Sequence, residues 1–136
     1  RLRDIPYHHR QGTYYQEVKD KYKLIGGTYA RMEARSCYNW HTDKAIGFQI
    51  PVITNPDCSF IFKMDDNKAW AFSPEPGKGY LVNNLVRHTF INGGDLPRYY
   101  LLQILNPNAL RDPEYKPYLR SSGFTLRDYI LSRDYV

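Results

Sequence analysis

The fold class is decided by residues 80–105, YLVNNLVRHTFINGGDLPRYYLLQIL. Three runs rich in Tyr, Leu, Ile, Val and Phe, at 80–86, 88–92 and 98–105, are separated by turn-forming residues. The widest break, residues 92–97, combines Asn, Gly, Asp and Pro, each of which favours a turn for its own reason. The stretch therefore predicts consecutive β-strands without intervening helices, which argues against a parallel sheet built from strand–helix–strand units.

The same pattern continues upstream. Further strand-like runs lie at 28–36, 46–53, 59–64 and 68–72, and turn compositions at 55–57, 65–67 and 74–79 interrupt them. Short strands in regular succession are typical of antiparallel sandwiches and barrels. We expect an all-β core with the architecture of a jelly-roll barrel, whose mouth can hold a small ligand.

Short helices are expected on both sides of this core. Residues 14–23 carry Tyr and Val at helical spacing, and Thr125 can cap a short amphipathic helix that runs through Ser132. No repeat or linker divides the chain. We therefore predict one domain over residues 1–136, with a helix at about 14–23, the barrel at about 24–105 and a tail over 106–136 that crosses the barrel surface.

Composition narrows the class of protein. The chain has 136 residues, of which 42% are hydrophobic and 24% charged, and its net charge is +5. No apolar run could span a membrane, and the basic N-terminus leads into no apolar signal core. Cys37 and Cys58 show no disulfide or zinc spacing and are expected to be small buried side chains, so a reducing, cytoplasmic location is predicted.

The basic residues are dispersed along the chain, which argues against a nucleic-acid partner. We expect a small molecule or a peptide as substrate, no membrane partner, and leave the oligomeric state open.

His41-Thr42-Asp43 is the first motif that carries chemistry. Residues i and i+2 of an extended segment point to the same side, so His41 and Asp43 can bind one metal ion together. By itself the motif fits a surface histidine beside a solvated aspartate equally well.

His88 opens the run HTFIN and is the best candidate for a third ligand. Two histidines and one carboxylate form the facial triad of non-haem Fe(II) oxygenases, which leaves coordination positions for an organic co-substrate and dioxygen. Iron is therefore the expected metal, with zinc as its competitor.

Arg98 follows the break at 92–97. If this loop closes a hairpin, Asn92 pairs with Arg98, and His88 and Arg98 then face the same side, about 13 Å apart along the strand. A guanidinium grips a carboxylate through two hydrogen bonds and keeps its charge. Arg98 and a dicarboxylate chelating the metal could together span this distance.

The stretch from Arg31 to Ile104 resembles the aspartyl/asparaginyl β-hydroxylase-like branch of the Fe(II)/2-oxoglutarate-dependent dioxygenases. The matching pieces, in the order of the family, are WHTD at 40–43, IPV at 50–52 with TNP at 54–56, Trp70, and RHTFIN at 87–92 leading to Arg98. They span roughly half of the chain.

The resemblance implies a double-stranded β-helix, or cupin barrel, that couples oxidative decarboxylation of 2-oxoglutarate to succinate with hydroxylation of a C–H bond by dioxygen. It implies that His41, Asp43 and His88 bind Fe(II), and that Arg98 holds the distal carboxylate of 2-oxoglutarate. Arg31 lies near the place where some relatives have a second donor to the co-substrate.

This chain also departs from the family's pattern. Relatives often carry Arg-x-His just before the Ile-Pro step, where this chain has Gly47-Phe48-Gln49. Gln49 can contribute a hydrogen bond to the co-substrate but no positive charge. Asp43, in contrast, completes the triad, and its presence argues against halogenation.

Four further residues are candidates for the substrate pocket: Tyr38, Trp40, Trp70 and Asn92. The three aromatic residues could equally pack in the core or at the rim, and Asn92 could simply open the turn at Gly93-Gly94. Two other functions remain open on the same barrel: a non-catalytic cupin-like module that binds a metal or ligand, and a metal-dependent isomerase or hydrolase.

Overall fold

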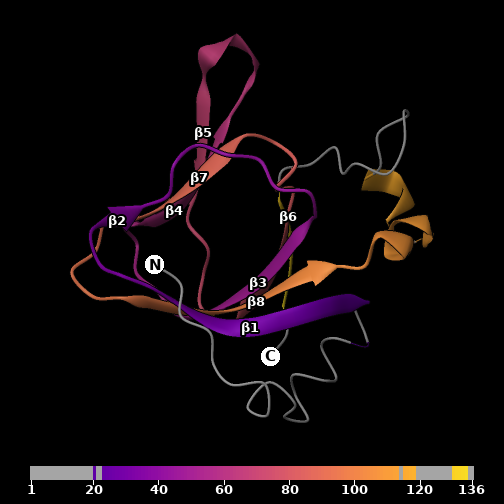
Figure 1. Cartoon of the computed structure of the whole chain (residues 1–136), viewed down its shortest axis with the longest axis horizontal. Helices are drawn as coiled ribbons and strands as arrows, with labels where there is room; N and C mark the ends of the chain where they lie inside the picture. The colour runs from indigo at the N-terminus through magenta and orange to yellow at the C-terminus, as the bar shows by residue number, and fades with distance from the viewer. Residues whose placement is uncertain (1–19, 21–22, 114, 119–129, 135–136) are drawn as a thin grey trace.

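A computed structural model describes residue 20 and residues 23–113, 115–118 and 130–134. These residues form two antiparallel sheets that face each other (Figure 1). The five-stranded sheet has the order β1 (Leu24–Met32), β8 (Arg98–Leu105), β3 (Gly47–Ile53), β6 (Lys78–Val82) and β9 (Ile130–Asp134). The four-stranded sheet has the order β2 (Ser36–Cys37), β7 (His88–Asn92), β4 (Cys58–Lys63) and β5 (Ala69–Phe72). The predicted fold class, an all-β jelly-roll barrel, is confirmed.

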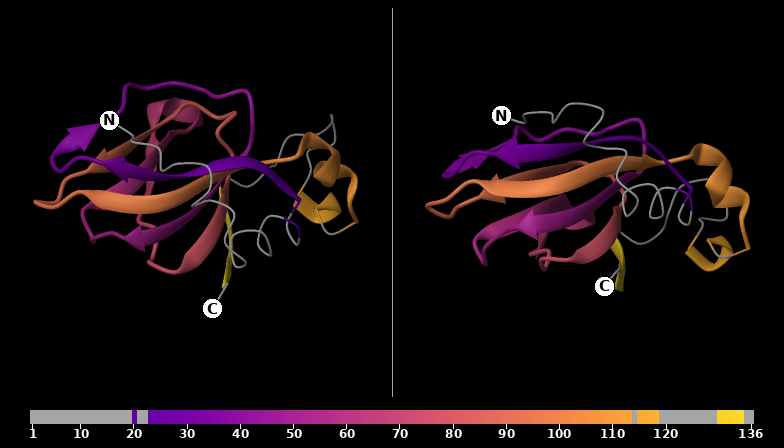
Figure 2. Two further views of the ribbon diagram at one scale, coloured as in Figure 1. Left: turned by 60° about the horizontal axis from the view of Figure 1, so that its bottom comes forward. Right: turned by 90° about the horizontal axis from the view of Figure 1, so that it is seen from below.

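Three 3-10 turns complete the described residues. η2 (Asp65–Asn67) forms the tip of the β4–β5 hairpin. η3 (Pro107–Arg111) and η4 (Lys116–Tyr118) follow β8 at one end of the barrel (Figure 2). None of the described helical segments is long and apolar enough to cross a lipid bilayer.

Apolar side chains form two clusters, one on each face of the five-stranded sheet. The inner cluster lies between the sheets and includes Met32, Phe60, Phe62, Val82 and Tyr100. The outer cluster joins alternate residues of β3 and β8 to residues of the tail: Phe48, Ile50, Leu101, Leu105, Ala109, Leu110 and Tyr115. β3 and β8 are therefore covered on both faces, and residues at every second position point into the barrel.

The expected hairpin between Asn92 and Arg98 is wrong. Asn92 pairs with Ser36 and Cys58 in the four-stranded sheet, whereas Arg98 pairs with Met32 in the five-stranded sheet. The loop at 93–97 crosses from one sheet to the other, as jelly-roll connections do. Turn composition alone does not distinguish such a crossing from a hairpin, because both need the same residue types.

One predicted strand boundary and one predicted burial also need correction. The strand expected at 80–86 ends at Val82, because Asn83 and Asn84 form a turn in which the side chain of Asn83 accepts a hydrogen bond from the amide of Leu85. Cys37 is exposed and only Cys58 is buried.

The helix expected to end at Ser132 is wrong over its last residues. Residues 130–134 form β9, which pairs with β6 from Lys78 to Val82. An available strand edge satisfies more backbone hydrogen bonds than a short isolated helix, so tertiary context overrides local helical propensity. The remainder of this helix, and the helix expected at 14–23 apart from residue 20, lie outside the described residues.

Asn92 connects the two sheets at the point where the chain crosses between them. Its side chain is fully buried and donates to the carbonyl oxygens of Met32, Glu33 and Leu96. Its Oδ1 accepts a hydrogen bond from the amide of Gly94 at 3.1 Å. From its place in β7, the side chain thus satisfies backbone groups at the end of β1 and in the loops that follow β1 and β7.

Replacing Asn92 by alanine is expected to lower the free energy of unfolding by about 2–3 kcal/mol, because several buried backbone groups lose the hydrogen bonds that Asn92 makes to them. Urea denaturation measures this loss. The matched variant Asn108→Ala, at an exposed asparagine, should change stability by less than about 0.5 kcal/mol. Equal effects of the two substitutions would contradict the role of Asn92.

Candidate metal centre

Backbone pairing brings His41, Asp43 and His88 together. The amide of His41 donates to the carbonyl of His88 at 3.0 Å, and the amide of His88 donates to the carbonyl of His41 at 2.9 Å. Two residues that exchange both hydrogen bonds in an antiparallel bridge carry their side chains on the same side. The amide of Asp43 is held at 2.8 Å by the carbonyl of Asn84, in the loop after β6.

Two short hydrogen bonds determine the tautomers of the histidines. Nδ1 of His41 lies 2.7 Å from the carbonyl oxygen of Asn39, and Nδ1 of His88 lies 2.7 Å from that of Val86. A carbonyl oxygen can only accept, so each Nδ1 carries the proton. In the neutral rings, each Nε2 therefore has a free lone pair, as a metal-binding imidazole requires.

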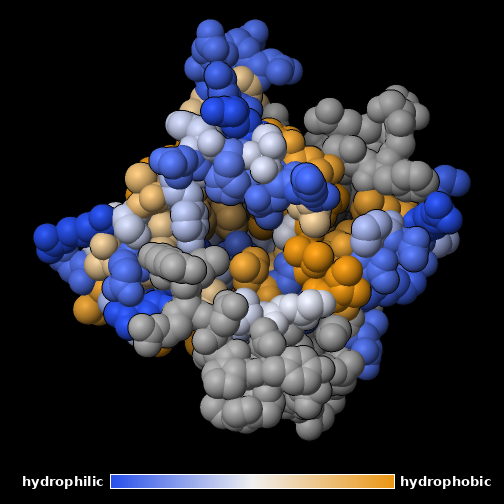
Figure 3. All heavy atoms as spheres, in the orientation of Figure 1, coloured by the Kyte–Doolittle hydropathy of each residue, from blue (hydrophilic) through white to orange (hydrophobic). Residues whose placement is uncertain are grey.

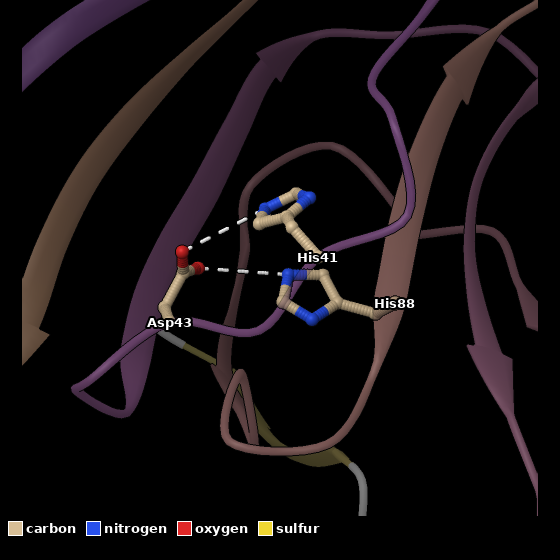
Figure 4. A group of neighbouring side chains, drawn as sticks. All are labelled: His41, Asp43 and His88. Carbon is tan, nitrogen blue, oxygen red and sulfur yellow. Dashed lines mark ion pairs between the residues drawn. The ribbon is translucent and has the colours of Figure 1, made fainter.

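Both Nε2 atoms face the carboxylate of Asp43 (Figure 4). Nε2 of His41 lies 3.7 Å from Oδ1 of Asp43, and Nε2 of His88 lies 3.6 Å from Oδ2. The ligand atoms of the three residues lie within 4.8 Å of one another. Two neutral imidazole lone pairs and a carboxylate repel one another unless a cation lies between them, so the donor set fits a divalent metal ion.

Burial favours the neutral form of His88. Its side chain is only 6% exposed, and desolvation lowers the pKa of this imidazole below its ordinary value. The hydrogen bond to Val86 and the charge of Asp43 oppose this shift, whereas the neighbouring His41 adds to it. His88 thus offers a neutral imidazole that could bind a metal ion without first losing a proton at neutral pH.

A cavity of about 310 Å³ extends from the triad into the barrel. This volume is near the lower end of the range typical of small-ligand pockets, about 300–1,000 Å³. Its walls combine the triad with Arg98, polar side chains and apolar rings, and the lining residues are Tyr38, His41, Asp43, Gln49, Phe60, Asn84, His88, Phe90, Arg98, Tyr100 and Leu102. The hollow is visible between the two sheets in Figure 3.

Arg98 places a buried positive charge in this cavity. Its side chain is 1% exposed, and its guanidinium carbon lies 3.9 Å from the ring centroids of both Phe90 and Tyr100. Among the described residues no carboxylate pairs with Arg98, and its Nε has no hydrogen-bond partner. Burial lowers the pKa of Arg98 to about 10, so the group remains charged at neutral pH. Burying a cation without a carboxylate partner costs free energy, because the charge loses its hydration. An anionic ligand in the cavity would offset this cost.

Gln49 orients this guanidinium. Its Oε1 accepts a hydrogen bond from Nη2 of Arg98 at 2.5 Å, and the side chain is buried in the cavity wall. The contact crosses from β3 to β8, which are neighbours in the five-stranded sheet. Gln49 thus holds one edge of the guanidinium and leaves the rest of it for another partner.

The structure brings six of the ten predicted site residues to one cavity and leaves four outside its lining. The six are His41, Asp43, His88, Arg98, Gln49 and Tyr38. Arg31 pairs with Glu33 and lines a different hollow, with Tyr99. Trp70 packs between Phe62 and Phe72, Asn92 is engaged between the sheets, and Trp40 lies in a separate basic hollow.

Five lining residues were not singled out from the sequence: Phe60, Asn84, Phe90, Tyr100 and Leu102. Phe90 follows His88 by two positions, and Tyr100 and Leu102 follow Arg98 by two and four, so strand alternation could have identified all three. Asn84 and Phe60 do not alternate with any predicted site residue. They reach the cavity because backbone contacts join segments that are far apart in the sequence.

The sequence matches no protein-family model and no curated protein. Solved structures do resemble it. A 2OG-Fe(II) oxygenase-family oxidoreductase from Burkholderia pseudomallei superposes on 60% of this chain with TM-score 0.52 and 16% identity, over 43% of its own length. A cupin domain from Bordetella pertussis Tohama I superposes on 61% with TM-score 0.48 and 16% identity, over 82% of its length. A Cupin 2 conserved barrel domain protein from Salinispora arenicola superposes on 61% with TM-score 0.42 and 12% identity, over 64% of its length.

At these identities the similarity concerns the fold, and the matched part is less than half of the Burkholderia oxygenase. The described residues form a jelly-roll barrel, and a group of three residues in it could hold a metal ion.

Proposed function

We propose that this protein is an Fe(II)- and 2-oxoglutarate-dependent dioxygenase of the aspartyl/asparaginyl β-hydroxylase-like branch. It would couple decarboxylation of 2-oxoglutarate to succinate with hydroxylation of an amino acid, a peptide or another small molecule. One observation carries the proposal: a two-histidine, one-carboxylate donor set and a buried arginine without an acidic partner line the same cavity. The likeness to a 2OG-Fe(II) oxygenase-family structure supports it at the level of the fold.

In this proposal His41, Asp43 and His88 hold the metal. The carbonyls of Asn39 and Val86 keep the Nδ1 protons in place, so that both rings present Nε2 without a change of tautomer. Three protein ligands leave positions open for the co-substrate and dioxygen. When bound, iron, 2-oxoglutarate and dioxygen together supply the oxidising power for hydroxylation.

Arg98 binds the distal carboxylate of 2-oxoglutarate. Its position between the rings of Phe90 and Tyr100 restricts the guanidinium to one plane, and Gln49 sets its rotation in that plane. A restricted guanidinium loses little entropy when it forms two parallel hydrogen bonds to a carboxylate. Phe60 and Leu102 add apolar surface to the same cavity, and a lower local dielectric constant strengthens this interaction.

An anaerobic titration tests the proposal. The metal-free protein is titrated with Fe(II) and then with 2-oxoglutarate, and we expect the weak visible charge-transfer band of a chelated complex. Admission of air should then produce succinate. Iron binding without a band and without succinate would overturn the proposal and favour a non-catalytic cupin that binds a metal.

The contact between Gln49 and Arg98 gives a specific prediction. Gln49→Glu keeps the size of the side chain but places a carboxylate beside the guanidinium, where it competes with the carboxylate of the co-substrate. We expect the affinity for 2-oxoglutarate to fall at least about tenfold, with Fe(II) affinity nearly unchanged, as measured by calorimetry.

Gln49→Leu is the matched control, because it removes the same hydrogen bond without adding charge. Its loss of 2-oxoglutarate affinity should be clearly smaller. Equal losses in both variants would show that charge competition at Arg98 does not determine binding.

A further inference from the structure

A second hollow lies on the outer face of the four-stranded sheet, behind the metal ligands. It has a volume of about 270 Å³ and is lined by Trp40, Lys63, Asn67, Lys68, Ala69 and Arg87. Trp40 and Arg87 directly precede His41 and His88, whose rings line the inner cavity. Because side chains alternate between the faces of a strand, these two residues are directed away from the metal centre.

Strand register brings the cations of this hollow together. The amide of Lys63 donates to the carbonyl of Arg87 at 2.9 Å, so these two residues are neighbours across β4 and the start of β7. Lys63 also pairs with Ala69 across the β4–β5 hairpin, and Lys68 directly precedes Ala69. This hairpin forms the hydrophilic projection at the top of Figure 3.

The three cations are unneutralised. Within the described part of the chain, Lys63, Lys68 and Arg87 have no ion-pair partner. The nearest acids along the chain, Asp65 and Asp66, belong to the η2 turn and do not line the hollow. The lining of the hollow therefore carries three positive charges and no carboxylate, which favours an anion.

Trp40 adds an aromatic surface to this charge. Its side chain is 43% exposed, and its indole makes no ring contact with the described residues. The exposed indole therefore has a face available to stack on a planar ring of a ligand, beside the three cations. Aromatic rings together with cations recognise the base and the phosphate of a nucleotide.

We propose that this hollow binds a nucleoside phosphate, with its base against Trp40 and its phosphates on Lys63, Lys68 and Arg87. An acidic peptide would satisfy the cations but would leave the indole without a stacking partner, whereas a nucleoside phosphate can contact both. The proposal is independent of the metal centre. The three cations are not contiguous in the sequence, so this positive cluster could not be predicted from the sequence alone.

Tryptophan fluorescence provides a direct test on the metal-free protein. The chain contains two tryptophans, so Trp70→Phe leaves Trp40 as the only reporter. Addition of adenosine diphosphate should quench this fluorescence saturably at low salt, and the affinity should fall as salt increases. Pyrophosphate, which lacks the base, should bind at least about fivefold more weakly, because base stacking contributes about 1–3 kcal/mol.

Charge reversal tests the cations. Lys68→Glu should weaken binding of adenosine diphosphate about tenfold, whereas Lys116→Glu, an equal charge change at an exposed lysine of η4, should have little effect. Arg98→Lys should leave the affinity unchanged, which separates this hollow from the inner cavity. Circular dichroism checks that each variant is folded.

The affinity for adenosine diphosphate is compared with that for a single-stranded oligonucleotide of twelve nucleotides. Equal affinities indicate that the ligand is a free nucleotide. A much higher affinity for the oligonucleotide indicates that the nucleoside phosphate belongs to a nucleic-acid strand. The proposal is overturned if neither binds, if pyrophosphate equals adenosine diphosphate, if polyglutamate competes equally, or if both lysine substitutions have the same effect.

Discussion

Asp43→Ala is expected to lower the affinity for Fe(II) more than about 100-fold and to abolish succinate formation. Asp43 provides the only carboxylate in the donor set, and both histidine Nε2 atoms face it at 3.6 and 3.7 Å. Without this charge, two neutral imidazoles remain to bind the ion. Calorimetric titration of the metal-free protein with Fe(II), followed by a succinate assay, measures both effects.

Asp65→Ala is the matched control, because it removes a carboxylate from the exposed η2 turn, away from the cavity. It should bind iron and form succinate like the unaltered protein. Asp43 is 45% exposed, so the Asp43→Ala protein should still fold. Retention of normal iron affinity in that variant would remove Asp43 from the metal centre.

Arg98→Lys is expected to weaken 2-oxoglutarate binding about 10- to 100-fold, while Fe(II) affinity changes less than about threefold. Lysine keeps the positive charge but cannot form two parallel hydrogen bonds to a carboxylate or lie as a plane between Phe90 and Tyr100. The loss should therefore concern the co-substrate and not the metal. Separate titrations with Fe(II) and with 2-oxoglutarate distinguish the two affinities.

Arg35 offers the matched control for this substitution. Its exposed guanidinium contacts Oδ1 of Asp95 through Nε and Nη2, and it does not line the cavity. Arg35→Lys should leave 2-oxoglutarate binding unchanged. If Arg98→Lys also left it unchanged, the distal carboxylate would have to bind elsewhere.

Most strand positions follow from local pattern. The runs at 46–53, 59–64, 68–72, 88–92 and 98–105 each correspond to a strand within one or two residues of the predicted bounds. The errors occur where pairing with a distant segment determines the local structure. β9 forms because β6 has an edge to pair with, and the chain at 93–97 crosses between sheets because Asn92 hydrogen-bonds to Met32 and Glu33.

In the candidate site, too, some features follow from the local sequence and others depend on contacts between distant segments. Residue type and the resemblance predicted that His41, Asp43, His88 and Arg98 share a site, and the four do line one cavity, although the hairpin expected to place Arg98 is wrong. Strand alternation could have added Phe90 and Tyr100. The unneutralised state of Arg98, the tautomers of the histidines and the contact with Gln49 could not be predicted, since each depends on which atoms three-dimensional packing brings within reach.

The sequence by itself determined the all-β class and the residue types of the candidate metal-binding group. Alternating apolar residues and turn formers specify strands locally, and only certain side chains can bind a metal or a carboxylate. Tertiary structure decided which strands share a sheet and which side chains share a cavity. It also placed Trp40 with the cations at 63, 68 and 87 on the opposite face. These outcomes depend on pairing between segments far apart in the chain, which no local pattern encodes.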